Sequence, residues 1–163
     1  MGYYITVVDI NVKFKISNSK KVLKAIKDLH GKETVGDSSG KHFSWVDNDF
    51  YKITSIRKMF SEWSWEIEKQ GKYYIIAYNT SEKLGDEETF LKAIAPYMED
   101  GFINVKGEND DYWRWEFNKG KFSTASGITA YGNNLYEAFI KEYNKSLPED
   151  IKKNLKMWAD TEH

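Results

Sequence analysis

Apolar residues recur along this chain with two different periods, and each period predicts one kind of element. Residues 3–16 are rich in β-branched and aromatic side chains, and apolar residues alternate with lysines from Val12 to Ile16. This alternation predicts a strand with one buried and one solvated face. The period then lengthens to that of a helix ending at Gly31, and a second helix is predicted after the capping residues 54–55.

The central part of the chain predicts a hairpin, a third helix and a small meander. Alternation returns over 63–79, where Gln70-Gly71 supplies a tight turn between two strands. The second of these strands has no polar face, so we expect it at the centre of a sheet. Asp86 is the expected cap of the third helix. Three strands joined by polar turns are predicted over 102–124.

Two segments between these elements carry weaker patterns. Residues 32–42 are polar and contain glycine, which predicts a surface loop, and HFSWV at 42–46 is expected to form a short strand. The glycine and lysine spacing over 36–42 is superficially similar to a phosphate-binding loop. A P-loop needs Ser or Thr after its lysine and an apolar strand before it, whereas His42 follows Lys41 here.

Because helices and strands do not alternate one for one, the predicted fold class is α+β. We expect a mostly antiparallel sheet with helices packed on one face. Residues 1–125 are expected to form this domain, and residues 126–163 a helical C-terminal extension packed on the same domain.

Composition narrows the possible chemistry. The 163 residues are 40% hydrophobic, which suffices for one domain with a sizeable core, and 16% are aromatic. The absence of cysteine excludes disulfides, thiolate metal ligands and thiol nucleophiles. We find neither a signal-peptide pattern nor a membrane-spanning run, so we expect a cytoplasmic protein, in the host cell if a phage encodes it.

Catalytic and metal-binding patterns are not found. The chain has three histidines, none within a catalytic motif, and no GxSxG sequence. Acidic residues cluster between positions 99 and 111, but their spacing fits no EF-hand loop, and we interpret them as a solvated turn. We therefore expect no enzymatic activity, no metal and no cofactor.

Charge is distributed unevenly and defines a first candidate surface. Residues 1–60 carry a net charge of +5, whereas residues 61–116 carry −7. Such asymmetry can steer a charged partner. Because the whole chain is slightly acidic and lacks an RNA-binding aromatic motif, a protein partner is favoured over nucleic acid. The candidate basic face consists of Lys13, Lys15, Lys20, Lys24 and Lys27.

The stretch DDYWRWEFNKGK at 110–121 has the most unusual composition. Its tryptophans and Phe117 share one face of the predicted strand, which indicates a core anchor, although a stacking platform for a ligand is the alternative. The opposite face and the preceding turn form a second candidate surface. Its residues are Asp110, Asp111, Tyr112 and Arg114.

A longer segment carries a resemblance. Residues 82–121, EKLGDEETFLKAIAPYMEDGFINVKGENDDYWRWEFNKGK, resemble a pattern in small uncharacterised bacterial and phage proteins, where a capped helix leads to a GEN/D-type turn and WRWxF…GK. The MGYY opening is also similar, whereas the chain departs from the pattern after about residue 125. The resemblance implies no assigned activity and no catalytic residues.

Three functions remain open from the sequence. The first is a non-enzymatic protein-binding protein that acts as a phage or mobile-element inhibitor of a host defence complex, as anti-CRISPR proteins do. The second is a small-ligand or nucleotide-binding module that uses the 36–42 loop. The third is an immunity protein that neutralises a cognate toxin. In each case we expect no membrane partner.

Overall fold

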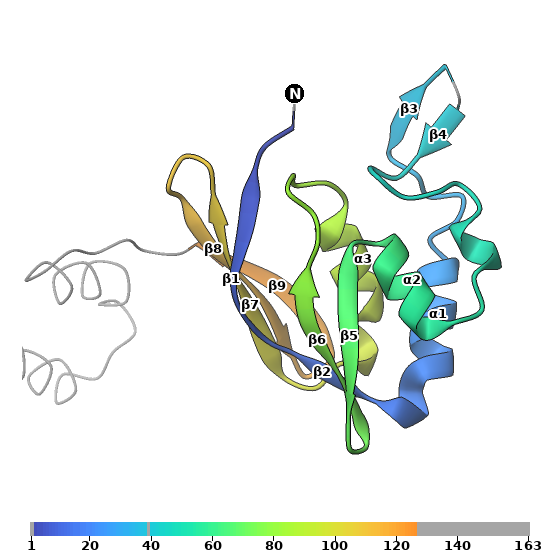
Figure 1. Ribbon diagram of the computed structural model, residues 1–163, viewed down its shortest axis with the longest axis vertical. Coiled ribbons are helices and arrows are strands. Elements are labelled where there is room, and N and C mark those ends of the chain that lie inside the picture. The colour runs from blue at the N-terminus through green and yellow to red at the C-terminus, as the bar shows by residue number, and fades with distance from the viewer. Residues whose placement is uncertain (1, 39, 127–163) are drawn as a thin grey trace, which may run out of the picture. The chain divides into compact units, whose positions relative to one another are not determined.

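The fold is α+β with antiparallel sheets, as predicted. A computed structural model describes residues 2–38 and 40–126 of the chain (Figure 1). The helices of this part are α1 (Ser19–Lys27), α2 (Ile56–Glu62) and α3 (Glu87–Ile94), with short 3₁₀ turns at Ile16–Asn18, Phe50–Lys52 and Ala95–Tyr97. The strands are β1 (Ile5–Asn11), β2 (Lys13–Lys15), β3 (Val35–Asp37), β4 (Gly40–His42), β5 (Trp65–Gln70), β6 (Tyr73–Asn79), β7 (Gly101–Gly107), β8 (Tyr112–Asn118) and β9 (Lys121–Ser126).

The described strands form three sheets. The largest has the order β1-β7-β8-β9, a second has the order β2-β6-β5, and β3 pairs with β4 alone. The predicted hairpin is confirmed as β5–β6, and β6 lies between two strands, as its lack of a polar face indicated. The predicted meander is confirmed as β7–β8–β9. Figure 1 shows α1, α2 and α3 together on one side of the two larger sheets.

The first predicted strand is in fact two strands that belong to different sheets. β1 pairs antiparallel with β7, and after Val12 the chain continues as β2 and pairs antiparallel with β6. The predicted alternation holds in β2, where Phe14 is buried between two exposed lysines. Ile16 leaves the strand and begins a 3₁₀ turn. The prediction of one continuous strand was wrong because local alternation does not specify which neighbour a strand pairs with.

An aromatic cluster joins the helices to both larger sheets. Phe90 of α3 stacks on Trp63 at 5.3 Å and on Trp65 of β5 at 6.5 Å, and Trp65 contacts Trp115 of β8 edge-on at 6.4 Å. Because each such side chain buries about 150–250 Å², this cluster accounts for much of the apolar burial. Trp115 and Phe117 are buried, which confirms the predicted core role for these two residues, whereas Trp113 on the same face is half-buried and packs against the core.

The two weakly patterned segments differ from the prediction. Val35–Asp37 and Gly40–His42 pair as a short hairpin where a loop was expected. HFSWV does not form a strand, because Val46 N donates a hydrogen bond to the Phe43 carbonyl and closes a turn. Residues 36–42 therefore do not connect a strand to a helix N-terminus, which is the geometry that a phosphate-binding loop requires.

The predicted helical extension over 126–163 lies outside the described residues, apart from Ser126 at the end of β9. Among the helices that the structure describes, none is long and apolar enough to cross a membrane.

Candidate functional site

β1 approaches β6 at one end, separates from it, and then meets the segment that follows β6. Ile76 N donates a hydrogen bond of 3.1 Å to the Val12 carbonyl at one end of the separation. At the other end Ile5 N donates to the Glu82 carbonyl, also at 3.1 Å. Between these two bonds the strands belong to different sheets and are not paired. The separation is therefore closed at both ends and open in the middle.

Two β-bulges explain why the strands separate. The register of β1 with β7 shifts between Val7 and Asp9, which leaves Val8 without a partner. In the pairing of β6 with β5, Ile76 lies opposite Ile67 and Tyr78 lies opposite Glu66. Ala77, between them, therefore has no partner in β5. A bulge bends its strand and increases the local twist. One bulge in each strand, both beside the same gap, turns the two strands away from each other.

The edge of β1 that faces the gap carries unpaired backbone groups. The Tyr4 carbonyl accepts from Glu108 N, on the side of β7, whereas Ile5 N bonds to the opposite side. Because successive peptide groups of a strand point to alternate edges, Val7 shares the edge of Ile5. The bulge then places Ile10 on that same edge, in phase with Val12. The backbone groups of Val7 and Ile10 thus point into the gap.

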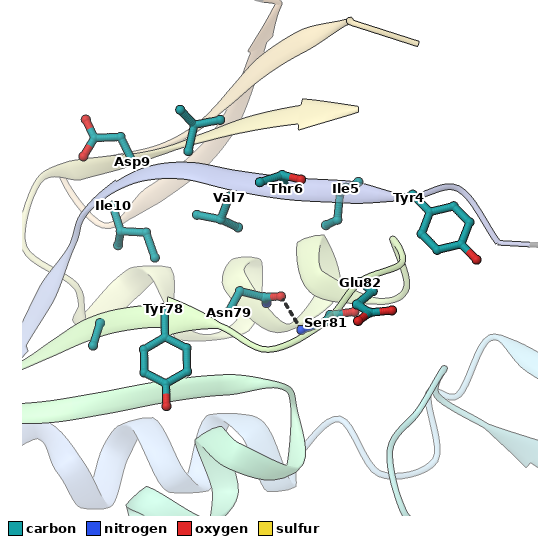
Figure 2. A pocket seen from close by; sticks show the side chains of 12 residues that line it. Tyr4, Ile5, Thr6, Val7, Asp9, Ile10, Tyr78, Asn79, Ser81 and Glu82 are labelled. Carbon is teal, nitrogen blue, oxygen red and sulfur yellow. Dashed lines mark hydrogen bonds between the residues drawn. The ribbon is translucent and has the colours of Figure 1, made fainter. Parts of the chain in front are cut away.

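The gap forms a groove of about 640 Å³. We call it the bulge groove; it is lined by Tyr4, Ile5, Thr6, Val7, Val8, Asp9, Ile10, Ala77, Tyr78, Asn79, Ser81 and Glu82. Figure 2 shows Val7 and Ile10 extending from β1 toward β6, whereas Asp9 extends on the other side of β1. Its lining contains two carboxylates and neither lysine nor arginine. The groove therefore has an apolar floor and an acidic rim.

A second, smaller hollow adjoins the bulge groove. We call it the turn hollow; its volume is about 350 Å³, and it is lined by Trp45, Ser64, Thr80, Ser81, Glu82 and Lys83. Ser81 and Glu82 line both depressions, so the two form one continuous surface. Lys83 makes a cation–π contact within this surface, because its ammonium lies 5.0 Å from the centre of the Tyr4 ring.

Trp45 is the most exposed large apolar side chain that the structure describes. Its exposed fraction is 67%, and its φ is 64°. It occupies the third position of the turn that Val46 N closes on Phe43, where a positive φ normally favours glycine. A left-handed conformation costs a non-glycine residue roughly 1–2 kcal/mol. An exposed tryptophan in a strained conformation points to a role in binding.

The turn that carries Trp45 is tied to the helices by two carboxylates. Asp86 accepts a hydrogen bond of 2.7 Å from Ser44 N, and Glu62 accepts one of 2.6 Å from Asp47 N. Asp86 stands at the predicted N-cap of α3, but its side chain makes no cap hydrogen bond; it binds this turn and the Thr34 hydroxyl instead. The tryptophan is thus presented on an anchored turn.

The connection between β6 and α3 is also held in place. Glu87 is buried, and its carboxylate accepts a hydrogen bond of 2.6 Å from Gly85 N. Burial raises the pKa of Glu87, and the bond from Gly85 opposes that rise in part. Thr80 N donates to the Ser64 carbonyl at 2.8 Å. A contact surface built on such a segment loses little conformational entropy on binding.

The exposed apolar side chains concentrate on this surface. Tyr4 is 48% exposed, Tyr78 is 53% exposed, and both line the bulge groove together with exposed Val8. With Trp45, four of the six exposed large apolar residues among those that the structure describes line the two depressions. Exposed apolar groups that gather on one patch are typical of an interaction site.

The predicted basic face lies elsewhere, and contacts satisfy part of its charge. Lys13 lies 4.6 Å from the centre of the Tyr73 ring, and Lys15 lies 3.8 Å from Glu99. On α1 a bond of 2.6 Å to Asp28 raises the pKa of Lys24. Lys20 is exposed and Lys27 half-buried on the same helix. None of these five lysines lines the bulge groove or the turn hollow.

The predicted turn surface makes contacts within its own sheet. Asp110 pairs with Lys106 at 2.7 Å, and the hydrogen bond from the Tyr3 hydroxyl to Asp111 raises the pKa of Tyr3. The Lys106 ammonium also lies 5.7 Å from the centre of the Tyr112 ring.

Arg114 is engaged in the same way. Its Nε donates to Asn104 at 2.7 Å, and its guanidinium lies 4.2 Å from the centre of the Phe102 ring. Both of the predicted candidate surfaces are therefore separate from the groove.

Sequence reasoning missed the residues of the groove and of the turn, although one signal was present. Apolar positions in the first strand change from odd numbers, Ile5 and Val7, to even numbers, Ile10 and Val12. Such a change of phase within a strand indicates a bulge. For Trp45, the only signal was an aromatic residue beside polar, turn-forming residues.

No family model matches the chain, and no curated protein or solved structure matches it either. Within the described residues, no group of three or more His, Asp or Glu side chains is placed to hold a metal ion.

Proposed function

We propose that this protein acts by binding another protein, and that its contact surface comprises the bulge groove and the turn hollow. The observation that carries the proposal is Trp45, which is two-thirds exposed in a backbone conformation that favours glycine. Tryptophan and tyrosine are enriched among the residues that dominate binding free energy at protein interfaces. Tyr4 and Tyr78 extend the same surface.

The proposed partner is a complex of a host's defence system, and the proposed action is steric and non-enzymatic. The resemblance of residues 82–121 to small bacterial and phage proteins is the support for this choice. The protein would then act in the cytoplasm of the host cell, as a phage or mobile-element inhibitor.

The experiment is a pull-down from host lysate with the immobilised full chain, followed by mass spectrometry. Trp45→Ala is compared with the double variant Lys20→Glu plus Lys24→Glu, which changes the basic face of α1. We expect the wild type and the lysine variant to retain the same host proteins and Trp45→Ala to lose them.

Two results would contradict the proposal. If the chain retains no host protein above the level retained by an unrelated bait, the proposal that it binds a protein is wrong. Loss of the partner with the lysine variant, but not with Trp45→Ala, would assign the contact to α1 instead.

A further inference from the structure

The unpaired edge of β1 determines what kind of group the bulge groove can accept. Backbone N–H and C=O groups on an open strand edge pair readily with another strand. Natural proteins protect such edges with lysine, proline or bulges. Residues 6–10, TVVDI, contain neither lysine nor proline, and the bulge at Val8 leaves the backbone groups of Val7 and Ile10 without a partner strand. An extended peptide is the occupant whose own backbone matches a row of alternating donors and acceptors.

The length of the open edge sets the length of that peptide. The edge lies between the closing hydrogen bonds at Ile5 and Val12. At about 3.3 Å per residue this stretch of β1 spans roughly 23 Å, which accommodates roughly four to six residues of an added strand. β1 and β6 run antiparallel, because β2 continues β1 and pairs antiparallel with β6. An added strand would therefore run antiparallel to one wall and parallel to the other.

The charge of the groove selects the composition of the peptide. Asp9 and Glu82 are exposed residues of its lining, although Asp9 extends on the far side of β1 in Figure 2, and the lining includes no lysine or arginine. Its floor is apolar, formed by Val7 and Ile10. Since side chains of a strand alternate between faces, a peptide with basic side chains on one face and apolar side chains on the other complements both features.

We propose that the bulge groove binds an extended segment of the partner, with basic and apolar side chains in alternation, which adds to β1 as an antiparallel strand. This inference rests on the proposed protein-binding function and specifies the chemistry of the partner. The antiparallel direction on β1 is chosen because antiparallel pairing is the more stable per residue.

The test selects peptides from a random-peptide library on the purified full chain, with counter-selection on Asp9→Lys plus Glu82→Lys. Both carboxylates are exposed, so the double variant is expected to fold. Enriched peptides should alternate basic with apolar residues. Loss of the ion pairs at the two exposed carboxylates should weaken binding by the double variant roughly tenfold, which corresponds to about 1.4 kcal/mol. The matched control, Glu68→Lys plus Glu108→Lys, changes exposed carboxylates outside the groove and should bind as the wild type does.

The decisive readout is hydrogen exchange in β1. A bound peptide should slow exchange of the Val7 and Ile10 amides, and N-methylation of alternate peptide bonds should abolish binding. Binding without this protection, equal binding of the N-methylated peptide, or selection that fails to separate wild type from the double variant overturns the inference.

This test is separate from the test of protein binding. If the pull-down retains a partner through Trp45 and Asp9→Lys plus Glu82→Lys leaves that retention unchanged, the proposed function stands and strand addition fails. Because the peptide selection uses the purified chain alone, its result does not depend on finding that partner.

Discussion

β8 has the more unusual sequence of the two strands β8 and β1, but β1 is the strand that contributes to the candidate site. β8 contains the most conspicuous residues of the chain, yet two of its aromatic side chains, Trp115 and Phe117, belong to the core, and Trp115 Nε1 donates a hydrogen bond of 2.9 Å to Glu88. β1 is an ordinary valine-rich strand, yet one of its edges has no partner strand. The unusual aromatic residues of β8 therefore contribute to the core, whereas the unpaired backbone edge of β1 forms part of the candidate site.

The difference follows from strand neighbours. β8 lies between β7 and β9, so both of its edges are paired. β1 has β7 on one edge only, and the bulges at Val8 and Ala77 prevent β6 from pairing with the other. Aromatic residues in a sequence indicate which side chains are buried. They do not indicate whether both edges of a strand are paired, and only a strand with an unpaired edge has backbone groups that can bind a ligand.

The largest difference in stability should be between two single-residue deletions, one at the bulge of β1 and one in β7. Deletion of Val8 removes the bulge and leaves the inward residues of β1 on one regular face, so we expect a folded chain within about 2 kcal/mol of wild type. Deletion of Asn104 in β7 turns Ile103 and Val105 to opposite faces, although both are fully buried, and should prevent folding. Circular dichroism with urea unfolding measures both, and similar losses for the two deletions would contradict the assignment of the bulge.

The two faces of β8 should differ in their contribution to stability. Trp115→Ala removes a fully buried side chain and should lower the free energy of unfolding by about 3–5 kcal/mol. Arg114→Ala, on the outer face, should lower it by less than about 1 kcal/mol. Chemical unfolding gives both values, and a larger loss for Arg114→Ala would place the core on the other face.

Substitutions at Trp45 should separate stability from binding. At a φ of 64° glycine is unstrained, so we expect Trp45→Gly to be about 1 kcal/mol more stable than Trp45→Ala, which keeps a β-carbon. Both variants should bind the partner equally weakly, because both lack the indole. Thermal unfolding and a binding assay give the comparison. Greater stability of Trp45→Ala would show that the turn is not strained.

The smallest effect should appear in the pH dependence of stability. The folded pKa of Glu87 is raised by burial, so the folded state holds this proton to higher pH than the unfolded chain does. Stability should therefore fall as pH rises from the unfolded pKa, about 4.3, through the folded pKa, with the loss complete above it. Glu87→Gln should flatten this fall, whereas Glu68→Gln, at an exposed position, should not. Urea midpoints across this pH range that fall equally steeply in both variants would exclude Glu87 as the cause.

Periodicity predicted the elements that depend on local sequence. The helices, the β5–β6 hairpin and the burial of Trp115 follow from spacing and turn residues within short windows. The cap at Ser55 is confirmed as well, because its side chain accepts from Lys58 N.

The candidate site depended on information that such windows do not contain. Whether β1 pairs with β6 is a tertiary property, and only the change of phase around Val8 indicated a bulge. The position of Trp45 depends on Asp86 and Glu62, which are distant in sequence and hold its turn. Both features arise from long-range contacts that override local propensity.

Hydrogen exchange in β1 of the free protein tests the central claim most directly. Alternation directs the amides of Thr6 and Asn11 to β7, in the pairs Thr6–Lys106 and Asn11–Phe102. These two amides should exchange slowly, whereas those of Val7 and Ile10 should exchange much faster, although all four belong to one strand. Equal, strong protection of all four amides would show that both edges of β1 are paired, and would contradict the existence of an open groove.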